Sequence, residues 1–390
     1  MKNLYITSAS RTAVGSLGKS LKNESSEKLG SSVISDVIKK SKIKEIEVDE
    51  VIMGQVLTGG TGQNPARQAA MHSGIPKEKP AYVVNQVCGS GIRSVVSGFQ
   101  SIKSGDSKIV IAGGQESMSL APHAIHLRDG KKLGDAEIID TMIKDGLWDA
   151  FHGYHMGITA ENVAEKFQVT RNEQDKFAFK SQEKALKAQK ENKFAEEIVN
   201  YKIKSKKAEI NFNKDEHPRD GVSLETLSRL KPVFKKDGTV TAGNASGIND
   251  GAAAVVIMSN NEAEKRNIEK LVSIKSWASC GVDPALMGTG PIPSAKKALD
   301  LAGWTAKDVD LFEINEAFAA QSIAVVKTLS VPDEKVNVNG GAIALGHPIG
   351  ASGTRILVTL IHEMIKRDVK KGLATLCIGG GMGIAMCVER

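Results

Sequence analysis

The sequence predicts an α/β protein made of two copies of one strand-and-helix unit, with a long insertion in the first copy. Three observations lead to this fold class. Apolar runs of strand length alternate along the chain with segments of helical periodicity, which is typical of α/β sandwiches. Two stretches far apart in the sequence repeat the same order of motifs. One of the two copies also carries about 130 residues that the other lacks.

The first copy supplies most of the predicted elements. In chain order we expect strand Met1–Thr7, helix Ser26–Lys40, strand Val48–Met53, helix Pro65–Ser73, strand Ala81–Val84, a helix after Cys88, and strand Lys108–Gly114. Gly54–Gly62 is expected to be a loop, because it is rich in Gly and Thr.

The second copy repeats this order. Three pairs of segments match: Val48–Gln55 with Val309–Glu316, Ser90-Gly-Ile-Arg93 with Ser352-Gly-Thr-Arg355, and Ile109–Gly114 with Leu376–Gly380. Val48 and Ser90 are 42 positions apart, and their counterparts are 43 apart. Agreement in both order and spacing indicates a duplicated unit.

The copies differ in the segment before their last strand. Gly379–Val388 runs directly from a glycine turn into a strand, whereas the matching strand, Gly251–Met258, arrives only after the insertion. The predicted division is therefore residues 1–118 with 250–270, the inserted residues 119–249, and residues 271–390. Helices are expected in the insertion at Ala160–Phe167 and Arg171–Lys193. Because long insertions are usually functional, we interpret this one as a cover over the site.

Composition restricts the class of protein. The chain has 390 residues, 41% of them hydrophobic, and no apolar run of membrane-spanning length, signal-peptide core or peroxisomal signal, so a cytoplasmic protein without membrane contact is expected. The four cysteines form no CxxC pair and there is no HExxH motif, so neither a disulfide framework nor a metal site is indicated.

The net charge is +7, and residues 180–236 hold 15 Lys/Arg against 9 Asp/Glu. An anionic partner follows. Nucleic acid is one alternative, although no nucleic-acid-binding motif accompanies the lysines.

The chemistry is expected at Asn85–Ser94. Cys88 follows an apolar strand and precedes glycines that open a helix. Unpaired N–H groups and the dipole of a helix start stabilise a thiolate, so the pKa of Cys88 is expected to be low. The alternative is a buried structural cysteine, the commoner state for this residue type.

Three residues of the second copy are candidate partners of Cys88. His347 lies in the stretch Asn337–Gly353, which is too rich in glycine for a plain helix or strand. Cys377 ends a predicted strand before three glycines, and Asn315 ends another. Such positions present side chains to ligands in α/β proteins. Two thiols and a histidine can hold an acyl group covalently, move a proton at the carbon beside a thioester, and stabilise oxyanions. This set is suited to acyl transfer with carbon–carbon bond formation or cleavage.

The motifs together resemble the thiolase family over nearly the whole chain. The matching segments are Asn85–Gly91, Asn315–Gln321, Asn339–Gly353 and Cys377–Gly383. The resemblance implies a layered α-β-α-β-α fold with an inserted coenzyme A-binding domain. It implies that Cys88 is the acylated nucleophile, that His347 activates it and serves as an oxyanion donor, and that Cys377 is the acid/base at the α-carbon. It further implies that Asn315 orients a water in one oxyanion hole, while the backbone of Cys88 and Gly379 forms the other.

The resemblance also implies a coenzyme A site and an activity. The residues that match coenzyme A-contacting positions are Leu147, His155, Met156, Arg219, Ala242, Ser246, Ala317 and Phe318. Coenzyme A and acetyl-CoA are expected as substrates, acetoacetyl-CoA as product, with no permanently bound cofactor and no metal. The expected reaction is a ping-pong condensation of two acetyl-CoA molecules, and the alternative is degradative thiolysis of 3-ketoacyl-CoA. A decarboxylating condensing enzyme would have a second histidine where Cys377 stands. Family members are dimers or tetramers, and Ala121–Asp140 corresponds to their tetramer-forming loop.

Overall fold

In residues 3–204 and 209–390, the part of the chain that this computed structural model describes, ten strands form one mixed sheet. Nine of them lie in the order β14-β15-β16-β13-β1-β12-β5-β3-β4, and β2 pairs with β12. The strands are β1 (Leu4–Arg11), β2 (Gly15–Ser16), β3 (Glu50–Gly54), β4 (Ala81–Val84), β5 (Ile109–Ser117), β12 (Asn249–Ser259), β13 (Val272–Gly281), β14 (Leu311–Ile314), β15 (Lys371–Ile378) and β16 (Met382–Glu389).

The sheet consists of two halves with the same strand order. The path β1-β12-β5-β3 in one half corresponds to β13-β16-β15-β14 in the other. In each half the last pair, β3 with β5 or β14 with β15, is parallel, and the remaining pairs on these paths are antiparallel. The halves meet at β1 and β13, which share only the pairs Tyr5–Ser273 and Ile6–Val272. The predicted duplicated α/β fold is therefore confirmed.

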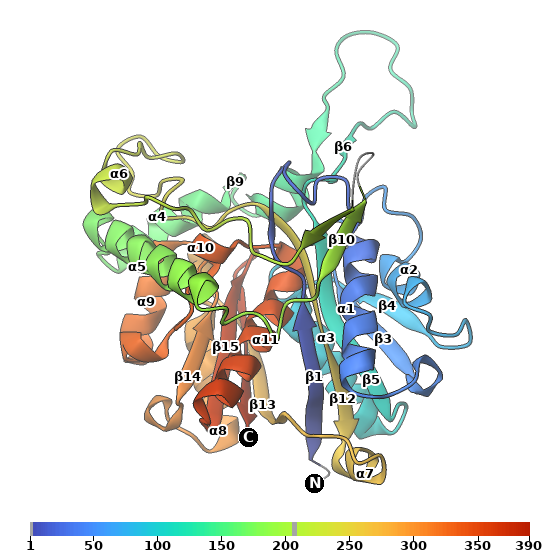
Figure 1. Ribbon diagram of the computed structural model, residues 1–390. Helices are drawn as coiled ribbons and strands as arrows, with labels where there is room; N and C mark the ends of the chain where they lie inside the picture. The colour runs from blue at the N-terminus through green and yellow to red at the C-terminus, as the bar shows by residue number, and fades with distance from the viewer. Residues whose placement is uncertain (1–2, 205–208) are drawn as a thin grey trace.

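Helices and sheet halves alternate in five layers (Figure 1). The helices of these layers are α1 (Ser26–Lys40), α2 (Pro65–His72), α3 (Ser90–Ser104), α8 (Pro291–Ala302), α9 (Ala319–Leu329) and α11 (Ile349–Arg367). Apolar residues of α3 and α11 share one core between the two halves, α1 and α2 cover the outer face of the first half, and α8 and α9 cover the second. Because α11 lies in the middle layer, most of its residues are buried, polar ones included.

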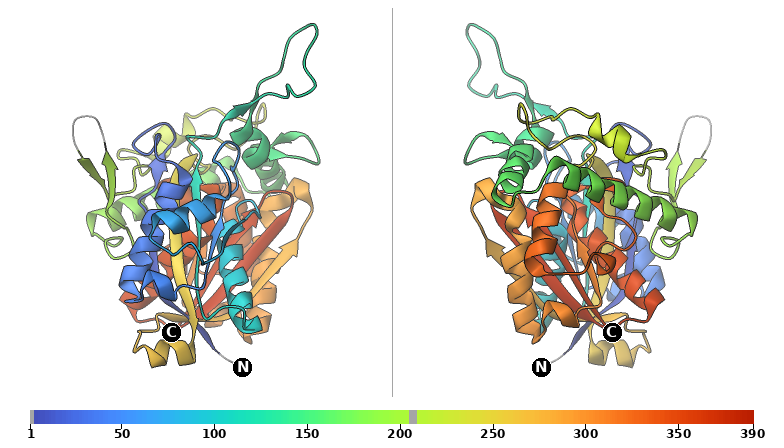
Figure 2. Two further views of the ribbon diagram at one scale, coloured as in Figure 1. Left: turned by 90° about the vertical axis from the view of Figure 1, so that its right-hand side faces the viewer. Right: turned by 90° about the vertical axis from the view of Figure 1, so that its left-hand side faces the viewer.

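The segment between β5 and β12 lies over one end of the sheet (Figure 1). Its elements are β6 (His123–Ala124), β7 (Ile139–Asp140), a π-helical turn (Met142–Leu147), β8 (Trp148–Asp149), β9 (Tyr154–His155), α4 (Met156–Lys166), α5 (Arg171–Lys190), β10 (Tyr201–Lys204), β11 (Glu209–Phe212) and α6 (Leu224–Ser228). Among the described residues its strands pair only with one another. The connection between β6 and β7 projects far from the rest of the molecule (Figure 2). The domain boundaries at 119 and 249 remain predictions, and β12 begins at Asn249 itself.

The remaining elements connect these layers. They are α7 (Asn260–Lys265), α10 (Ala342–Leu345) and four 3-10 segments at Glu45–Glu47, Pro284–Thr289, Ala306–Asp308 and Asp333–Lys335. Within the described ranges, no helix is both long and apolar enough to cross a membrane.

One detail of the predicted repeat is wrong. Gly113 and Gly114 lie inside β5, which continues to Ser117, whereas Gly379 and Gly380 form the turn after β15, so the two glycine pairs are not equivalent. The glycine-rich stretch 337–353, predicted to be neither a plain helix nor a plain strand and to lead into a helix, contains the four-residue α10 and the first turn of α11. The first strand begins at Leu4; Met1 and Lys2, and residues 205–208 of the basic segment, lie outside the described residues.

Candidate active site

The turn that carries Cys88 is fixed by side-chain hydrogen bonds to its backbone. Asn85 Oδ1 accepts from the N–H of Val87 at 2.9 Å, and Ser90 Oγ accepts from the N–H of Gln86 at 2.9 Å while donating to the carbonyl of Val87 at 2.6 Å. Val87 has φ +47°, which is rare for a β-branched residue and costs on the order of 1–3 kcal/mol. The local sequence thus holds a strained turn in which Cys88 faces a cavity.

The matching Ser-Gly-x-Arg motifs bring the starts of α3 and α11 into contact. A Cβ on Gly91 would lie 2.5 Å from the backbone nitrogen of Thr354, and a Cβ on Gly353 would lie 2.5 Å from that of Ile92. Only glycine allows so close an approach. The turn that carries Cys88, before α3, and the turn that carries His347, before α11, therefore lie close together.

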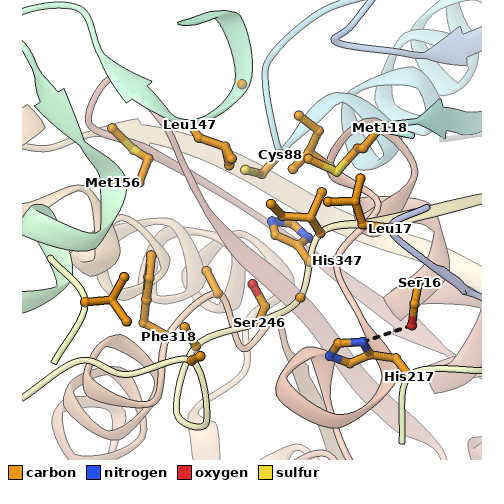
Figure 3. Close-up of a pocket in the computed structure, with 18 of the residues that line it drawn as sticks. Ser16, Leu17, Cys88, Met118, Leu147, Met156, His217, Ser246, Phe318 and His347 are labelled. Atoms are coloured by element: carbon orange, nitrogen blue, oxygen red, sulfur yellow. Dashed lines mark hydrogen bonds between the residues drawn. The ribbon is translucent and has the colours of Figure 1, made fainter. Parts of the chain in front are cut away.

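His347 lies two residues before α11 and is held from several sides. Its backbone N–H donates to Asn249 Oδ1 at 2.9 Å, and its Nδ1 is 2.6 Å from Ser352 Oγ. Asn315 follows β14, and its Nδ2 is 3.5 Å from the same Nδ1. Figure 3 shows His347 and Cys88 directed into one cavity.

Cys377 and Gly379 come from the end of β15. Cys377 is the last residue but one of this strand, and its buried thiol lies close enough to Cys88 for the two to interact electrostatically. The backbone N–H of Gly379 lies near enough to the Cys88 thiol to lower the pKa of that thiol. The structure therefore brings both thiols, the imidazole and a backbone donor together.

One cavity of about 650 Å³ contains twelve of the thirteen residues predicted for the site. They are Cys88, His347, Cys377, Gly379, Leu147, His155, Met156, Arg219, Ala242, Ser246, Ala317 and Phe318. Asn315 does not line the cavity; it is fully buried behind His347. The volume is in the range of ligand sites for small molecules and cofactors.

The imidazole of His347 and the thiol of Cys88 are both neutral at pH 7. Burial raises the pKa of the Cys88 thiol to about 11, although the N–H of Gly379 acts in the opposite direction. Burial lowers the pKa of His347 to about 3, and the charge of Arg355 lowers it further. Burial, and then the neighbouring Cys88, raise the pKa of Cys377. Thiol and neutral imidazole are thus favoured over thiolate and imidazolium.

The prediction of a low pKa for Cys88 is wrong for a physical reason. Cys88 lies before Gly89, the N-cap residue of α3. The N–H groups of Gly89 and Ser90 are already bonded to the carbonyls of Gln86 and Val87, so they are not available to a thiolate. Burial then outweighs the remaining stabilisation from the helix start.

Sequence reasoning missed part of the cavity wall. Phe234 stacks on His155 with ring centroids 4.6 Å apart and meets Phe318 edge-on at 6.4 Å. Ser16, Leu17, Lys19 and the segment Glu216–Pro218 also line the cavity, with Lys19 and Arg219 as its cations. Apart from Ser16, which ends β2, these residues belong to loops without periodicity or motif, so no local signal in the sequence marks them.

Other kinds of site are less well supported by the described residues. Among them no group of three or more His, Cys, Asp or Glu side chains is arranged to hold a metal ion, and all four cysteines are free. Around Cys88 the reactive groups of the cavity are two thiols, the imidazole of His347 and backbone N–H groups. That set can form a thioester and stabilise the oxyanions around it.

Comparisons with known proteins cover the whole chain. The family described as "Thiolase, N-terminal domain" matches residues 4–261, and "Thiolase, C-terminal domain" matches residues 268–390. An acetyl-CoA acetyltransferase of Rhizobium meliloti is 59% identical, with 100% of this chain and 99% of that protein covered. A cytosolic acetyl-CoA acetyltransferase of Rattus norvegicus is 54% identical over 99% of this chain and 98% of its own.

Solved structures give the same result. The acetyl-CoA acetyltransferase of Bacillus anthracis has a TM-score of 0.98 and 45% identity, with 100% of this chain and 99% of that chain covered. Human mitochondrial 3-ketoacyl-CoA thiolase has a TM-score of 0.97 and 42% identity, covering 100% and 98%. The fold is thus shared by proteins with both of the activities considered above.

Proposed function

The chain belongs to the thiolase family as an acetyl-CoA acetyltransferase, and we propose that it joins two acetyl-CoA molecules to acetoacetyl-CoA and free coenzyme A, and catalyses the reverse thiolysis. The observation that carries this proposal is the meeting of Cys88, Cys377, His347 and the N–H of Gly379 in one cavity. A single thiol would suffice for acyl transfer, but condensation also requires a proton to be removed from a carbon atom.

In the first half-reaction Cys88 is acetylated. Its sulfur attacks the thioester carbonyl of acetyl-CoA as its proton passes to His347, and the tetrahedral oxyanion is stabilised by backbone N–H groups of Cys88 and Gly379. The carbon–sulfur bond to coenzyme A breaks, and the leaving thiolate takes the proton of Cys377. Acetyl-Cys88, a protonated His347 and a Cys377 thiolate result. Because the ground-state pair is neutral, proton transfer accompanies the attack.

In the second half-reaction a new carbon–carbon bond forms. The Cys377 thiolate removes a proton from the methyl carbon of a second acetyl-CoA, and His347, now protonated, donates to the enolate oxygen. The carbanion attacks the acetyl carbonyl on Cys88. Acetoacetyl-CoA is released, and the Cys88 sulfur recovers its proton from His347. Both thiols and the neutral imidazole are restored, so protons balance over the cycle.

Asn315 is proposed to hold a water molecule in the enolate site. Its Oδ1 is buried and has no protein partner, and its Nδ2 is only 3.5 Å from the ring of His347. Buried polar atoms of this kind are usually satisfied by water. Such a water could donate to the enolate oxygen together with His347.

The remaining cavity residues are proposed to bind coenzyme A. Lys19 and Arg219 are the cations of the wall and suit the phosphates, while the small residues Ala242, Ser246 and Ala317 leave room for the pantetheine arm. Leu147, Met156 and Phe318 add apolar surface, and His155 lies beside Phe318 across Phe234. Coenzyme A is thus a substrate here, not a resident cofactor.

The degradative 3-ketoacyl-CoA activity is the second candidate. The similarity to the human mitochondrial 3-ketoacyl-CoA thiolase favours it, because the two folds agree at a TM-score of 0.97. Identity is lower, however, at 42% against 59% for the acetyl-CoA acetyltransferase. Thiolysis rates for 3-ketoacyl-CoA of increasing chain length decide between them. A preference for acetoacetyl-CoA supports the acetyltransferase.

We also propose that copies of the chain assemble through Ala121–Asp140. Leu133, Ile138 and Leu127 in this projecting connection are exposed by 92%, 66% and 51%. Exposed apolar side chains of this size are typical of contact surfaces. Light scattering of the intact protein and of Leu133→Glu tests this assembly, and an unchanged mass in the variant would contradict it.

The decisive experiment for the activity is the intact mass after brief incubation with acetyl-CoA. We expect one acetyl adduct on the wild type, none on Cys88→Ala, and its removal by free coenzyme A. Absence of an adduct on freshly reduced wild type, with longer 3-ketoacyl thioesters tried as donors, would refute the proposed covalent step.

A further inference from the structure

We propose that Ser352 is a positioning residue for His347: its hydroxyl keeps the proton of the neutral ring on Nδ1, so that Nε2 offers its lone pair to Cys88. Ser352 lies in the first turn of α11 and is fully buried. The inference rests on the proposed function only for the task assigned to His347. The hydrogen bonds from which it is argued do not depend on that task.

Two short contacts decide where the ring proton resides. Ser352 Oγ is 2.8 Å from the carbonyl oxygen of Pro348 and 2.6 Å from His347 Nδ1. A carbonyl oxygen only accepts, so the single hydroxyl proton of Ser352 is donated to Pro348. The hydroxyl oxygen must then accept from His347, which requires a proton on Nδ1. A neutral imidazole with Nδ1–H has its lone pair on Nε2.

The other neighbours of the ring do not oppose this assignment. Asn315 Nδ2 could donate to Nδ1, but at 3.5 Å that contact is far weaker than the one of 2.6 Å to Ser352. The main chain of His347 is held separately, because its backbone N–H donates to the side-chain Oδ1 of Asn249 at 2.9 Å. Ser352 is therefore the contact that orients the ring, while Asn249 locates the backbone.

The first half of the fold contains the same device. By the Ser-Gly-x-Arg repeat, Ser90 is the counterpart of Ser352. Ser90 donates to a carbonyl of the turn before its helix, that of Val87 at 2.6 Å, and accepts from the N–H of Gln86 at 2.9 Å. Each serine thus donates its hydroxyl proton to a backbone carbonyl and accepts, through its oxygen, from a group of the catalytic turn. This serine position holds the turn of the nucleophile Cys88 in the first half and the ring of the base His347 in the second.

The chain offers a matched control in α8. Ser294, like Ser352, is the fourth residue of its helix, is fully buried, and donates to the carbonyl of the N-cap residue, here Gly290, at 2.9 Å. It contacts no catalytic group. Ser352→Ala and Ser294→Ala therefore remove the same helix-start hydrogen bond, and only the first removes the acceptor for His347. Ser352→Thr keeps a hydroxyl and tests rescue.

The test measures the ring itself and the turnover. Nitrogen-15 NMR of histidine-labelled enzyme, with His347 assigned from its loss in His347→Asn, reports which ring nitrogen is protonated. We expect Nδ1–H in the wild type and in Ser294→Ala, and a mixture of tautomers in Ser352→Ala. In Ser352→Ala we further expect kcat for condensation to fall about 100-fold with KM within about twofold of the wild type, since a misoriented base costs this much. Ser352→Thr should recover part of kcat.

Three results would overturn the proposal: Nε2–H in the wild type, unchanged turnover in Ser352→Ala, or equal losses of turnover in the two alanine variants. The acetyl-adduct experiment on the wild type distinguishes failure of the role proposed for Ser352 from failure of the proposed function. An enzyme that forms no adduct refutes the acetyl transfer, whereas the tautomer of His347 is still read from the spectrum and decides the role of Ser352 in holding the ring.

Discussion

In the ligand-free enzyme, alkylation of Cys88 by iodoacetamide should rise about tenfold for each pH unit from pH 6 to pH 9, without a plateau. Only the thiolate reacts, and burial raises the pKa of this thiol to about 11. At pH 7 about one molecule in 10⁴ then carries the thiolate, compared with about 3 in 100 for a free cysteine with a pKa of about 8.5. His347 does not compensate, because burial lowers its own pKa to about 3.

The assay is a short iodoacetamide pulse at each pH, followed by peptide mass analysis that separates Cys88 from the partly exposed Cys280. Cys88→Ala identifies the peptide and supplies the blank. A plateau at or below pH 7 would refute the reasoning, because it would require a preformed thiolate–imidazolium pair. The Cys88 thiol and the His347 imidazole would then not be neutral in the ground state, and proton transfer would not need to accompany the attack of the sulfur.

Three further predictions test other parts of the structure. Cys377→Ala should still form the acetyl adduct but lose condensation by at least about 10²-fold, and normal condensation would disprove its role at the α-carbon. Gly353→Ala places a Cβ 2.5 Å from the backbone of Ile92 and should destabilise the protein by about 1–3 kcal/mol in urea unfolding, whereas Gly59→Ala, whose Cβ would meet nothing nearer than 3.6 Å, should not. The pKa of His347 is about 3 in the folded protein and about 6.5 in the unfolded chain, so as the pH falls the unfolded state binds the proton first. The free energy of unfolding of the wild type should therefore decrease by about 2 kcal/mol between pH 7.5 and pH 5, and that of His347→Asn should not show this decrease.

The site was predictable where strand ends and glycine turns mark it. Asn315 directly follows β14, Cys377 lies near the end of β15, and Cys88 lies in the turn between β4 and α3. The glycines beside Cys88 and Cys377 indicate close backbone approach, so these residues can be inferred locally as parts of a site. Phe234 has no such signal, since it lies in an irregular segment, although it lines the cavity and stacks on His155. The pKa of Cys88 also escaped prediction, because it depends on burial contributed by distant parts of the chain.

The register of the sheet gives Cys377 a counterpart that matching of the sequences missed. Met53 in β3 pairs with Gly113 in β5, and its repeat counterpart, Ile314 in β14, pairs with a residue two places before Cys377 in β15. Two places after Gly113 lies Gln115, which is therefore equivalent to Cys377. Its buried amide donates to Gln55 Oε1 at 2.9 Å and ties β5 to the segment after β3. One strand position thus serves packing in the first half and faces the reaction cavity in the second.

Residues that hold the backbone of the site in place differ from residues that act on a reacting group, and the two kinds should respond differently to substitution. Gly91 and Gly353 let α3 and α11 meet, so replacing either displaces both catalytic turns, and activity and stability should fall together. Ser352 orients one ring through one hydroxyl, so its removal should reduce turnover far more than Ser294→Ala while costing similar stability. The duplicated fold supplies one direct comparison of this kind, because Gln115 holds two segments of the first half together while its counterpart Cys377 faces the reaction cavity.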